Sequence, residues 1–191
     1  LWLGIGEELL GSWGFYGIID QGTGYMVHGA FYDTVGQSAV EDALRSALQA
    51  HGLPRKLYLP SGHHIQIGWM RKACQRLGIR LLHARPAAAG ESPQKSVARR
   101  FLEQLEGGQP ETLDQLNQQF QNWLQEVYHE TPQKETGCSP RKAFERAGKP
   151  TKQLESSMLD RAFLHRERRK VDARGYISFH GGKYLVGTHL A

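Results

Sequence analysis

The chain has few cysteines and no long hydrophobic run. Its two cysteines, Cys74 in a helical pattern and Cys138 in a loop, are too few for a disulfide framework or a cysteine-based metal cluster. We therefore expect reduced thiols, with Cys74 packed in the core. No apolar run approaches the roughly 20 residues that span a bilayer, and the opening LWLGIGEELLG lacks the basic start and apolar centre of a signal peptide. These absences predict a cytoplasmic protein without a membrane partner.

The composition is that of a globular domain with an excess of positive charge. Hydrophobic residues make up 39% of the 191 residues and charged residues 23%, enough for one domain and an appendage. The formal net charge is +5, and basic residues concentrate after residue 140. That excess favours a polyanionic partner. Because the chain starts at Leu1 and stops just after the strand-like YLVG, we expect it to be a piece of a longer protein.

The first half of the chain has the pattern of an α/β domain. Two β-prone runs in GFYGIIDQGTGYMVHGAFY flank a glycine-rich turn at 20–24, which predicts a hairpin. A strand expected over 1–5 would make this an antiparallel meander. The elements predicted next are a helix over 38–51, a strand over 57–59, a helix over 69–77 and a strand over 79–83. Strand, helix and strand with short links indicate a parallel crossover that extends the sheet.

The second half is mainly helical and ends in short strands. The predicted helices cover 95–106, 113–128, 140–147 and 154–165, after a Pro- and Ala-rich loop at 85–94. The helix over 113–128 carries an apolar face formed by Leu116, Phe120, Trp123, Leu124 and Val127. We divide the chain into a domain over 1–148, a linker and helix over 149–168, and the start of a small β-barrel over 169–191.

Several short motifs occur in a characteristic order. They are Trp2, IID at 18–20, LPRKLY at 53–58, LGI at 77–79, HARP at 83–86, Trp123, Tyr128, TG at 136–137, SP at 139–140, Phe144 and the tail FLHRERRKVDARGYISFHGGKYLV. In order and spacing they resemble the integrase catalytic core of DDE transposases, in particular the bacterial branch related to Mu transposase. The resemblance covers nearly the whole chain. It implies a ribonuclease H-like five-stranded mixed sheet flanked by helices and followed by a small β-barrel.

The resemblance also implies three carboxylates, which this chain lacks. Family members cleave and join DNA with two Mg²⁺ ions held by two Asp and one Glu, because Mg²⁺ prefers anionic oxygen ligands. Carried over one position at a time, the first Asp falls on Ile5 and the second on Pro60. The Glu falls on Ala98, or on Ser96 in an alternative alignment. None of these residues is acidic, so we expect no catalytic residues and no metal at the degenerate positions.

Displaced acids are an alternative that the sequence leaves open. Glu7 shares strand parity with Ile5, Asp20 begins the hairpin turn, and Glu91 precedes the helix over 95–106. An Asp at the start of a turn more often stabilises the turn by hydrogen bonds than binds a metal ion. Beside Pro60 the nearest candidates are His63 and His64, and imidazole is a poor Mg²⁺ ligand.

Two groups of cations are candidates for DNA contacts. Arg85, Lys95, Arg99 and Arg100 flank the degenerate positions, although they could equally form a solvated helix face. The second group comprises Arg166, Arg168, Arg169 and Lys170, within a basic stretch over 161–174. Such a cluster gives salt-dependent, sequence-independent affinity for phosphates. Its alternative is a linker kept soluble by charge.

These observations predict a degenerate transposase or integrase core of a mobile element. We expect it to bind DNA in transposition or DNA integration without strand-transfer activity of its own, and to use no cofactor, whereas active family members use Mg²⁺. Its expected partners are DNA and either further copies of itself or an active transposase subunit. Two alternatives remain: an active Mg²⁺-dependent polynucleotidyl transferase that uses displaced acids, and a protein-interaction module.

Overall fold

The computed structural model describes residues 2–10, 13–59, 67–83, 93–105, 110–134, 136–148, 154–164, 169–179 and 181–188. The strands within these ranges are β1 (Trp2–Leu10), β2 (Trp13–Asp20), β3 (Met26–Tyr32), β4 (Lys56–Leu59), β5 (Arg80–His83), β6 (Tyr176–Phe179) and β7 (Gly182–Leu185). The helical elements are α1 (Gln37–His51), α2 (Ile67–Leu77), α3 (Pro93–Glu103), α4 (Leu113–Trp123), η1 (Leu124–Tyr128), α5 (Pro140–Arg146) and α6 (Ser156–Phe163). Three strands come first, helices and strands alternate from α1 to α3, and further helices and a hairpin follow, so the predicted α/β class is confirmed.

Five strands form one mixed sheet in the order β3-β2-β1-β4-β5. β1 pairs antiparallel with β2, and β2 pairs antiparallel with β3, as the predicted meander requires. β4 joins β1 in parallel, and β5 joins β4 in parallel. The first and fourth strands are therefore neighbours. β1 continues to Leu10, beyond the predicted strand over 1–5.

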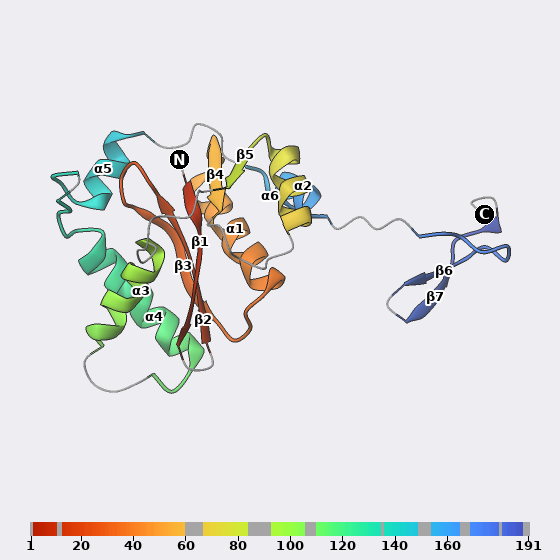
Figure 1. Cartoon of the computed structure of the whole chain (residues 1–191), viewed down its shortest axis with the longest axis horizontal. Helices are drawn as coiled ribbons and strands as arrows, with labels where there is room; N and C mark the ends of the chain where they lie inside the picture. The colour runs from red at the N-terminus through yellow and green to blue at the C-terminus, as the bar shows by residue number, and fades with distance from the viewer. Residues whose placement is uncertain are drawn as a thin grey trace.

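Helices cover both faces of this sheet because the strand β2 is apolar on both sides. In β2, Tyr16 and Ile18 pack into one core cluster, whereas Phe15 and Ile19 pack into another. Figure 1 shows α1, α2 and α6 on one side of the sheet and α3 and α4 on the other. Alternating side chains of one strand thus supply two cores, as expected for a sheet buried on both faces.

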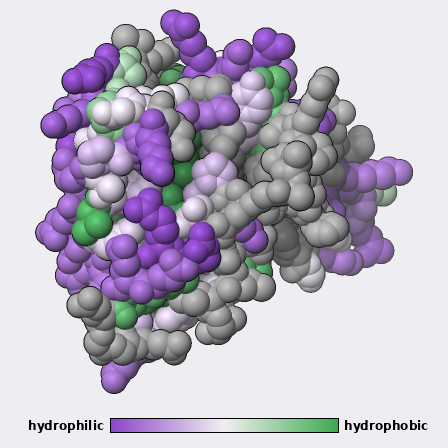
Figure 2. Space-filling model, turned by 60° about the vertical axis from the view of Figure 1, so that its left-hand side comes forward, coloured by the Kyte–Doolittle hydropathy of each residue, from purple (hydrophilic) through white to green (hydrophobic). Residues whose placement is uncertain are grey.

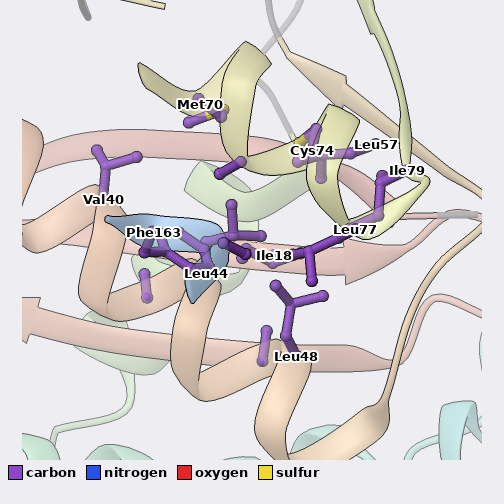
Figure 3. Packing of buried hydrophobic residues seen from close by; sticks show 14 of the residues in the cluster. Ile18, Val40, Leu44, Leu48, Leu57, Met70, Cys74, Leu77, Ile79 and Phe163 are labelled. Carbon is purple, nitrogen blue, oxygen red and sulfur yellow. The ribbon is translucent and has the colours of Figure 1, made fainter. Parts of the chain in front are cut away.

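The cluster on the α1 side contains aliphatic side chains at helical spacing. Val40, Leu44 and Leu48 of α1 point at the sheet and meet Leu77 of α2 and Phe163 of α6 (Figure 3). The buried positions of α1 recur every three to four residues, which is the pattern that predicted this helix.

The helix predicted over 113–128 changes type in its last turn. α4 ends at Trp123, and residues 124–128 form the π-helix η1. A π turn holds one more residue than an α turn and rotates the residues after it to a different face of the helix. As a result Val127, predicted on the apolar face, is 39% exposed, whereas Tyr128 is only 4% exposed. The prediction for Val127 was wrong because sequence periodicity assumes an unbroken α-helix.

The helix that the sequence assigned to the linker segment contributes to the core. Leu159, Ala162 and Phe163 of α6 are buried with α1 and α2. Arg76 of α2 also donates hydrogen bonds to the carbonyl oxygens of Ala162 (2.7 Å) and Leu164 (2.9 Å), which satisfies acceptors at the end of α6. α6 therefore packs with the helices of the first 148 residues.

The tail of the chain forms a two-stranded antiparallel hairpin from β6 and β7. This is the extent of β structure in the described part of residues 169–191, so the hairpin is observed and a barrel is not. No helix in the described ranges is long and apolar enough to cross a membrane.

Candidate functional site

The first part of the candidate site is the place where β1 runs beside the end of β4. Trp2 pairs with Leu57 and Leu3 pairs with Tyr58, so the two strands run in step toward Ile5 and the end of β4. The register between β1 and β2 shifts between Leu3 and Gly6, which is a β-bulge that contains Ile5. Bulges are frequent next to active sites. Pro60 directly follows β4 but lies outside the described residues.

α3 approaches the sheet over a pair of glycines. Gly17 of β2 pairs with Gly6 of β1. A Cβ atom at Gly17 would lie 2.9 Å from the Phe15 ring and 3.3 Å from Cβ of Gln94 in the first turn of α3. Gln94 is only 2% exposed. Neither Gly17 nor Gln94 was singled out from the sequence, although a glycine inside an apolar strand is itself a signal of close backbone approach.

The two alternative positions for the third family acid lie in different environments on α3. Ala98 is fully buried in the core cluster with Val97 and Phe101. Ser96 is partly exposed and lines a surface cleft. A ligand at position 98 would face the hydrophobic core, so only position 96 has access to a bound ion or nucleic acid.

The displaced acids gain little support from the described residues. Asp20 is 9% exposed, and its Oδ1 accepts the hydroxyl of Thr23 at 2.9 Å. Its backbone carbonyl accepts the N–H of Gly24 at 2.8 Å, so Asp20 organises the β2–β3 turn. Glu7 is paired with Tyr16 in regular register, unlike Ile5 in the bulge. Glu91, His63 and His64 lie outside the described residues.

The donor set that the structure describes does not fit the Mg²⁺ pair of the resembling family. Ile5, Ser96 and Ala98 carry no carboxylate, and Mg²⁺ requires several hard oxygen ligands in near-octahedral geometry. In the described ranges no group of three or more His, Cys, Asp or Glu side chains could hold a metal ion. The described residues therefore support no catalytic step through a metal.

The predicted cations of α3 differ in their surroundings. Lys95 is partly exposed. Arg99 is exposed and pairs with Glu103 one turn later, at 2.7 Å. Arg100 is partly exposed, and its guanidinium lies over the Tyr128 ring, 5.8 Å from the centroid. Arg85 falls outside the described residues. Of the three described cations in this group, only Arg100 lines the same cleft as Ser96.

The cations near the hairpin are only partly described. Arg169 lies over the Phe179 ring at 5.5 Å, and Lys170 is exposed. Asp172, the acid in the described part of this segment, accepts the backbone N–H groups of Arg174 and Tyr176 at 2.9 Å each. Arg166, Glu167 and Arg168 lie outside the described residues. In residues 169–174 the cations therefore outnumber the one acid, which is hydrogen-bonded within a turn.

Two histidines that the sequence did not single out are of interest: His129 is fully buried and His28 is partly buried. His129 stacks on Tyr25 with ring centroids 3.8 Å apart, and its ring nitrogens make no hydrogen bond of good geometry with the described residues. Burial, reinforced by Arg141, lowers the pKa of His129 to about 3, against the opposing effect of the Met26 backbone. Burial also lowers the pKa of His28 to about 4, against the opposing effect of Asp42. Both side chains are neutral near pH 7, which favours a structural role.

Cys74 is buried as predicted. Its side chain packs in the core between α2 and α1, and burial raises the pKa of its thiol to about 12. Since the thiolate is the nucleophile, this cysteine is unsuited to covalent catalysis at neutral pH.

Comparisons with known proteins bear on the fold. No protein-family model and no curated protein matches the chain. Among solved structures, the catalytic core domain of HTLV-2 integrase in complex with magnesium, in a dimeric form, matches with a TM-score of 0.56 and 12% identity over 74% of this chain and 92% of that chain. A chain from the simian T-cell lymphotropic virus intasome in complex with PP2A regulatory subunit B56 gamma matches with a TM-score of 0.55 and 14% identity.

That second match covers 74% of this chain and 52% of the intasome chain, so our chain spans about half the length of this structural relative. At such low sequence identity the likeness concerns the backbone arrangement alone. The chain has the fold of a retroviral integrase catalytic core.

Proposed function

We propose that this protein is a degenerate integrase or transposase core that binds DNA and lacks strand-transfer activity of its own. The observation that carries the proposal is the combination of an integrase-core fold with non-acidic residues at the positions where family members hold metal ions. Ile5 lies in the β1 bulge beside the end of β4, and α3 presents Ser96 rather than an acid to the surface.

The charge distribution supports DNA as the partner. Arg100 and Lys95 are partly exposed on α3, and Arg169 and Lys170 precede the hairpin. Lysine and arginine side chains that neutralise phosphates displace counterions, which gives affinity without sequence preference. The chain is similar to a magnesium-bound integrase catalytic core and to a chain of an intasome. We extend the DNA association of the resembling DDE transposases to this chain as part of the proposal.

The finer assignment rests on the sequence motifs. We propose a ribonuclease H-like domain of the bacterial branch related to Mu transposase, derived from a mobile element. In this proposal the β6–β7 hairpin begins a small β-barrel, and the protein assembles with copies of itself or with an active transposase subunit. If a DNA-binding experiment finds no affinity for DNA, the alternative of a protein-interaction module is favoured.

That experiment measures duplex DNA binding and cleavage together. Fluorescence anisotropy of a labelled duplex at increasing salt should give a linear fall of log affinity with log salt concentration, with a slope of about −0.9 for each phosphate contact. Incubation with supercoiled DNA and Mg²⁺ or Mn²⁺ should give no nicked product. The double variant R169Q/K170Q should reduce the slope by roughly 2 if both cations contact phosphates.

The matched control is R71Q/K72Q, which removes two positive charges from adjacent exposed positions on α2, on the opposite side of the sheet from α3. It should bind DNA as the unmodified chain does. Affinity that is absent at low salt would sink the DNA-binding proposal, and metal-dependent nicking would sink the claim of lost chemistry.

A further inference from the structure

A cleft of about 530 Å³ opens between α3, the β2–β3 turn and the loop after η1. Among its lining residues are Gly24, Ser96, Arg100, Tyr128, Gln133 and Lys134. Figure 2 turns the side of the molecule that carries α3, α4 and α5 toward the viewer, where hydrophilic residues cover much of the described surface. The volume is within the range of about 300–1,000 Å³ that is usual for small-molecule sites.

The described charges of the cleft are of one sign. Among its described lining residues, Arg100 and Lys134 are cationic and none is Asp or Glu, whereas Glu135, between Lys134 and Thr136, lies outside the described residues. The lining also includes the first turn of α3, at Pro93 and Ser96, where the helix dipole adds partial positive charge. An anionic ligand is therefore favoured over a neutral or cationic one.

The walls of the cleft are held in place by internal hydrogen bonds. The Tyr128 hydroxyl donates to the carbonyl of Gly24 at 2.8 Å and accepts from Nε2 of Gln133 at 3.2 Å. These two bonds join η1, the β2–β3 turn and the loop residues 131–134. The loop is closed on itself by the Gly137 N–H, which donates to the Gln133 carbonyl at 2.9 Å. A site whose walls are already ordered loses less conformational entropy when it binds.

Gly24 allows this close approach. Its φ is +71°, and a Cβ atom there would lie 2.2 Å from Oε1 of Gln133. Only a glycine lets the turn and the loop meet without displacing the glutamine. The β2–β3 turn and the loop after η1 thus meet in one wall of the cleft that Arg100 also lines.

The cleft is amphipathic. Ile19, Val97 and Pro132 contribute apolar surface, and the Tyr128 ring lies under the guanidinium of Arg100. Apolar surface beside two cations suits a ligand that has a flat apolar body and a phosphate. Inorganic phosphate alone would leave the apolar part unused.

We propose that this cleft binds a phosphorylated ligand of single-nucleotide size, with its phosphate at Arg100 and Lys134. Two sources share this chemistry: a free nucleotide and the phosphorylated end of a nucleic acid strand. For the phosphorylated strand end, the inference rests on the proposed DNA binding. For a free nucleotide it does not.

Isothermal titration calorimetry of the whole chain tests the proposal with adenosine 5′-monophosphate, adenosine, inorganic phosphate, and a short single-stranded oligonucleotide with or without a 5′-phosphate. We expect adenosine monophosphate or the 5′-phosphorylated oligonucleotide to bind more tightly than adenosine and inorganic phosphate. Each of the variants R100Q and K134Q should weaken that binding by about tenfold, the usual effect of one charge-assisted hydrogen bond.

The probe that binds more tightly shows whether the ligand is a free nucleotide or a strand end. The control is R71Q, which removes one positive charge from the exposed surface of α2, as R100Q and K134Q each remove one from the cleft. Because Lys134 is an exposed loop residue, K134Q keeps the test valid if R100Q disturbs the packing on Tyr128. Four outcomes would overturn the inference: no phosphorylated probe binds, adenosine or inorganic phosphate binds equally well, R100Q and K134Q bind normally, or R71Q loses binding to the same extent.

Duplex binding measured in parallel separates this inference from the proposed function. Duplex affinity with no binding of any phosphorylated probe would refute the cleft and leave the DNA-binding core intact. Adenosine monophosphate binding without duplex affinity would refute the DNA-binding core and leave the cleft.

Discussion

Aromatic packing explains how one buried polar side chain, that of His129, is accommodated near the candidate site. His129 and Tyr25 form a stacked pair that continues to Phe144, whose ring centroid lies 4.4 Å from that of Tyr25. This aromatic cluster joins the end of the β2–β3 turn to the helices that close the domain. A neutral imidazole can act here as a flat packing group, but a protonated one would be a buried, unpaired charge.

The low pKa of His129 predicts acid sensitivity. Its pKa in the folded chain is about 3, below the ordinary 6.5, so the unfolded chain binds the extra proton between these pH values. The stabilisation is complete above pH 6.5 and is lost as the pH falls toward 3, at up to ~1.4 kcal/mol per pH unit. We expect the H129F variant to lose less free energy of unfolding between pH 6.5 and 4.5 than the unmodified chain.

Urea unfolding at several pH values measures this difference. His28, whose pKa is about 4, adds acid sensitivity of the same sign to both proteins, so the slope should fall without vanishing. Measurements at pH 8, where both histidines are neutral in the folded and unfolded chain, separate packing effects of the substitution. Parallel pH profiles for the two proteins would show that His129 does not titrate as described.

At this scale the sequence predicted some residues and missed others. Cys74 was predicted from its helical context, because a small apolar residue in an amphipathic pattern packs inward. His129, Gln94 and Gly17 were missed, since their importance depends on partners that are remote in sequence. Gln94 of α3, for example, meets Gly17 of β2 only after the sheet has formed.

Among the elements, α4 protects the edge of the sheet. β3 is an outer strand, with a row of backbone groups that another chain could pair with. Oδ1 of Asn117 accepts the Phe31 N–H at 2.7 Å, and its Nδ2 donates to the Phe31 carbonyl at 2.9 Å. Nε2 of Gln121, one turn later, donates to the Gly29 carbonyl at 2.7 Å. Side chains of the helix thus take the place of a further strand.

We expect N117A to lower the free energy of unfolding by about 1–3 kcal/mol, because it leaves two partly buried backbone groups of β3 without their partner. The exposed edge should also increase self-association. Chemical denaturation and light scattering measure the two effects. The control is Q118A on the exposed side of α4. Equal stability of N117A and Q118A would contradict the edge-protection role.

The bounds of the helices show where sequence periodicity is enough to predict the start and end of an element. α1 has its predicted span to within one residue at its start, because its apolar positions and Gly52 define both face and end. The predicted helices over 69–77, 95–106 and 154–165 instead cover 67–77, 93–103 and 156–163. The π turn of η1 could not be predicted, since it depends on the packing of Tyr128 against Gly24 and not on local propensity.

For the whole molecule, the succession of strands and helices along the chain was the most informative sequence prediction. Antiparallel meander followed by parallel crossover leaves few topologies, and the order β3-β2-β1-β4-β5 is one of them. The site was less predictable. Three of its cations, Arg85, Arg166 and Arg168, lie outside the described residues, and the cleft at Arg100 depends on a loop some 30 residues further along the chain.

The central claim is that an integrase-core scaffold persists here without the oxygen ligands that hold metal ions in the resembling family. A crystal of the chain soaked in Mn²⁺, with anomalous difference density inspected around Ile5, the end of β4 and Ser96, tests this claim most directly. The account predicts no ordered Mn²⁺ at that place. Two Mn²⁺ ions held by protein side chains, including any of Glu7, Asp20 or Glu91, would contradict it.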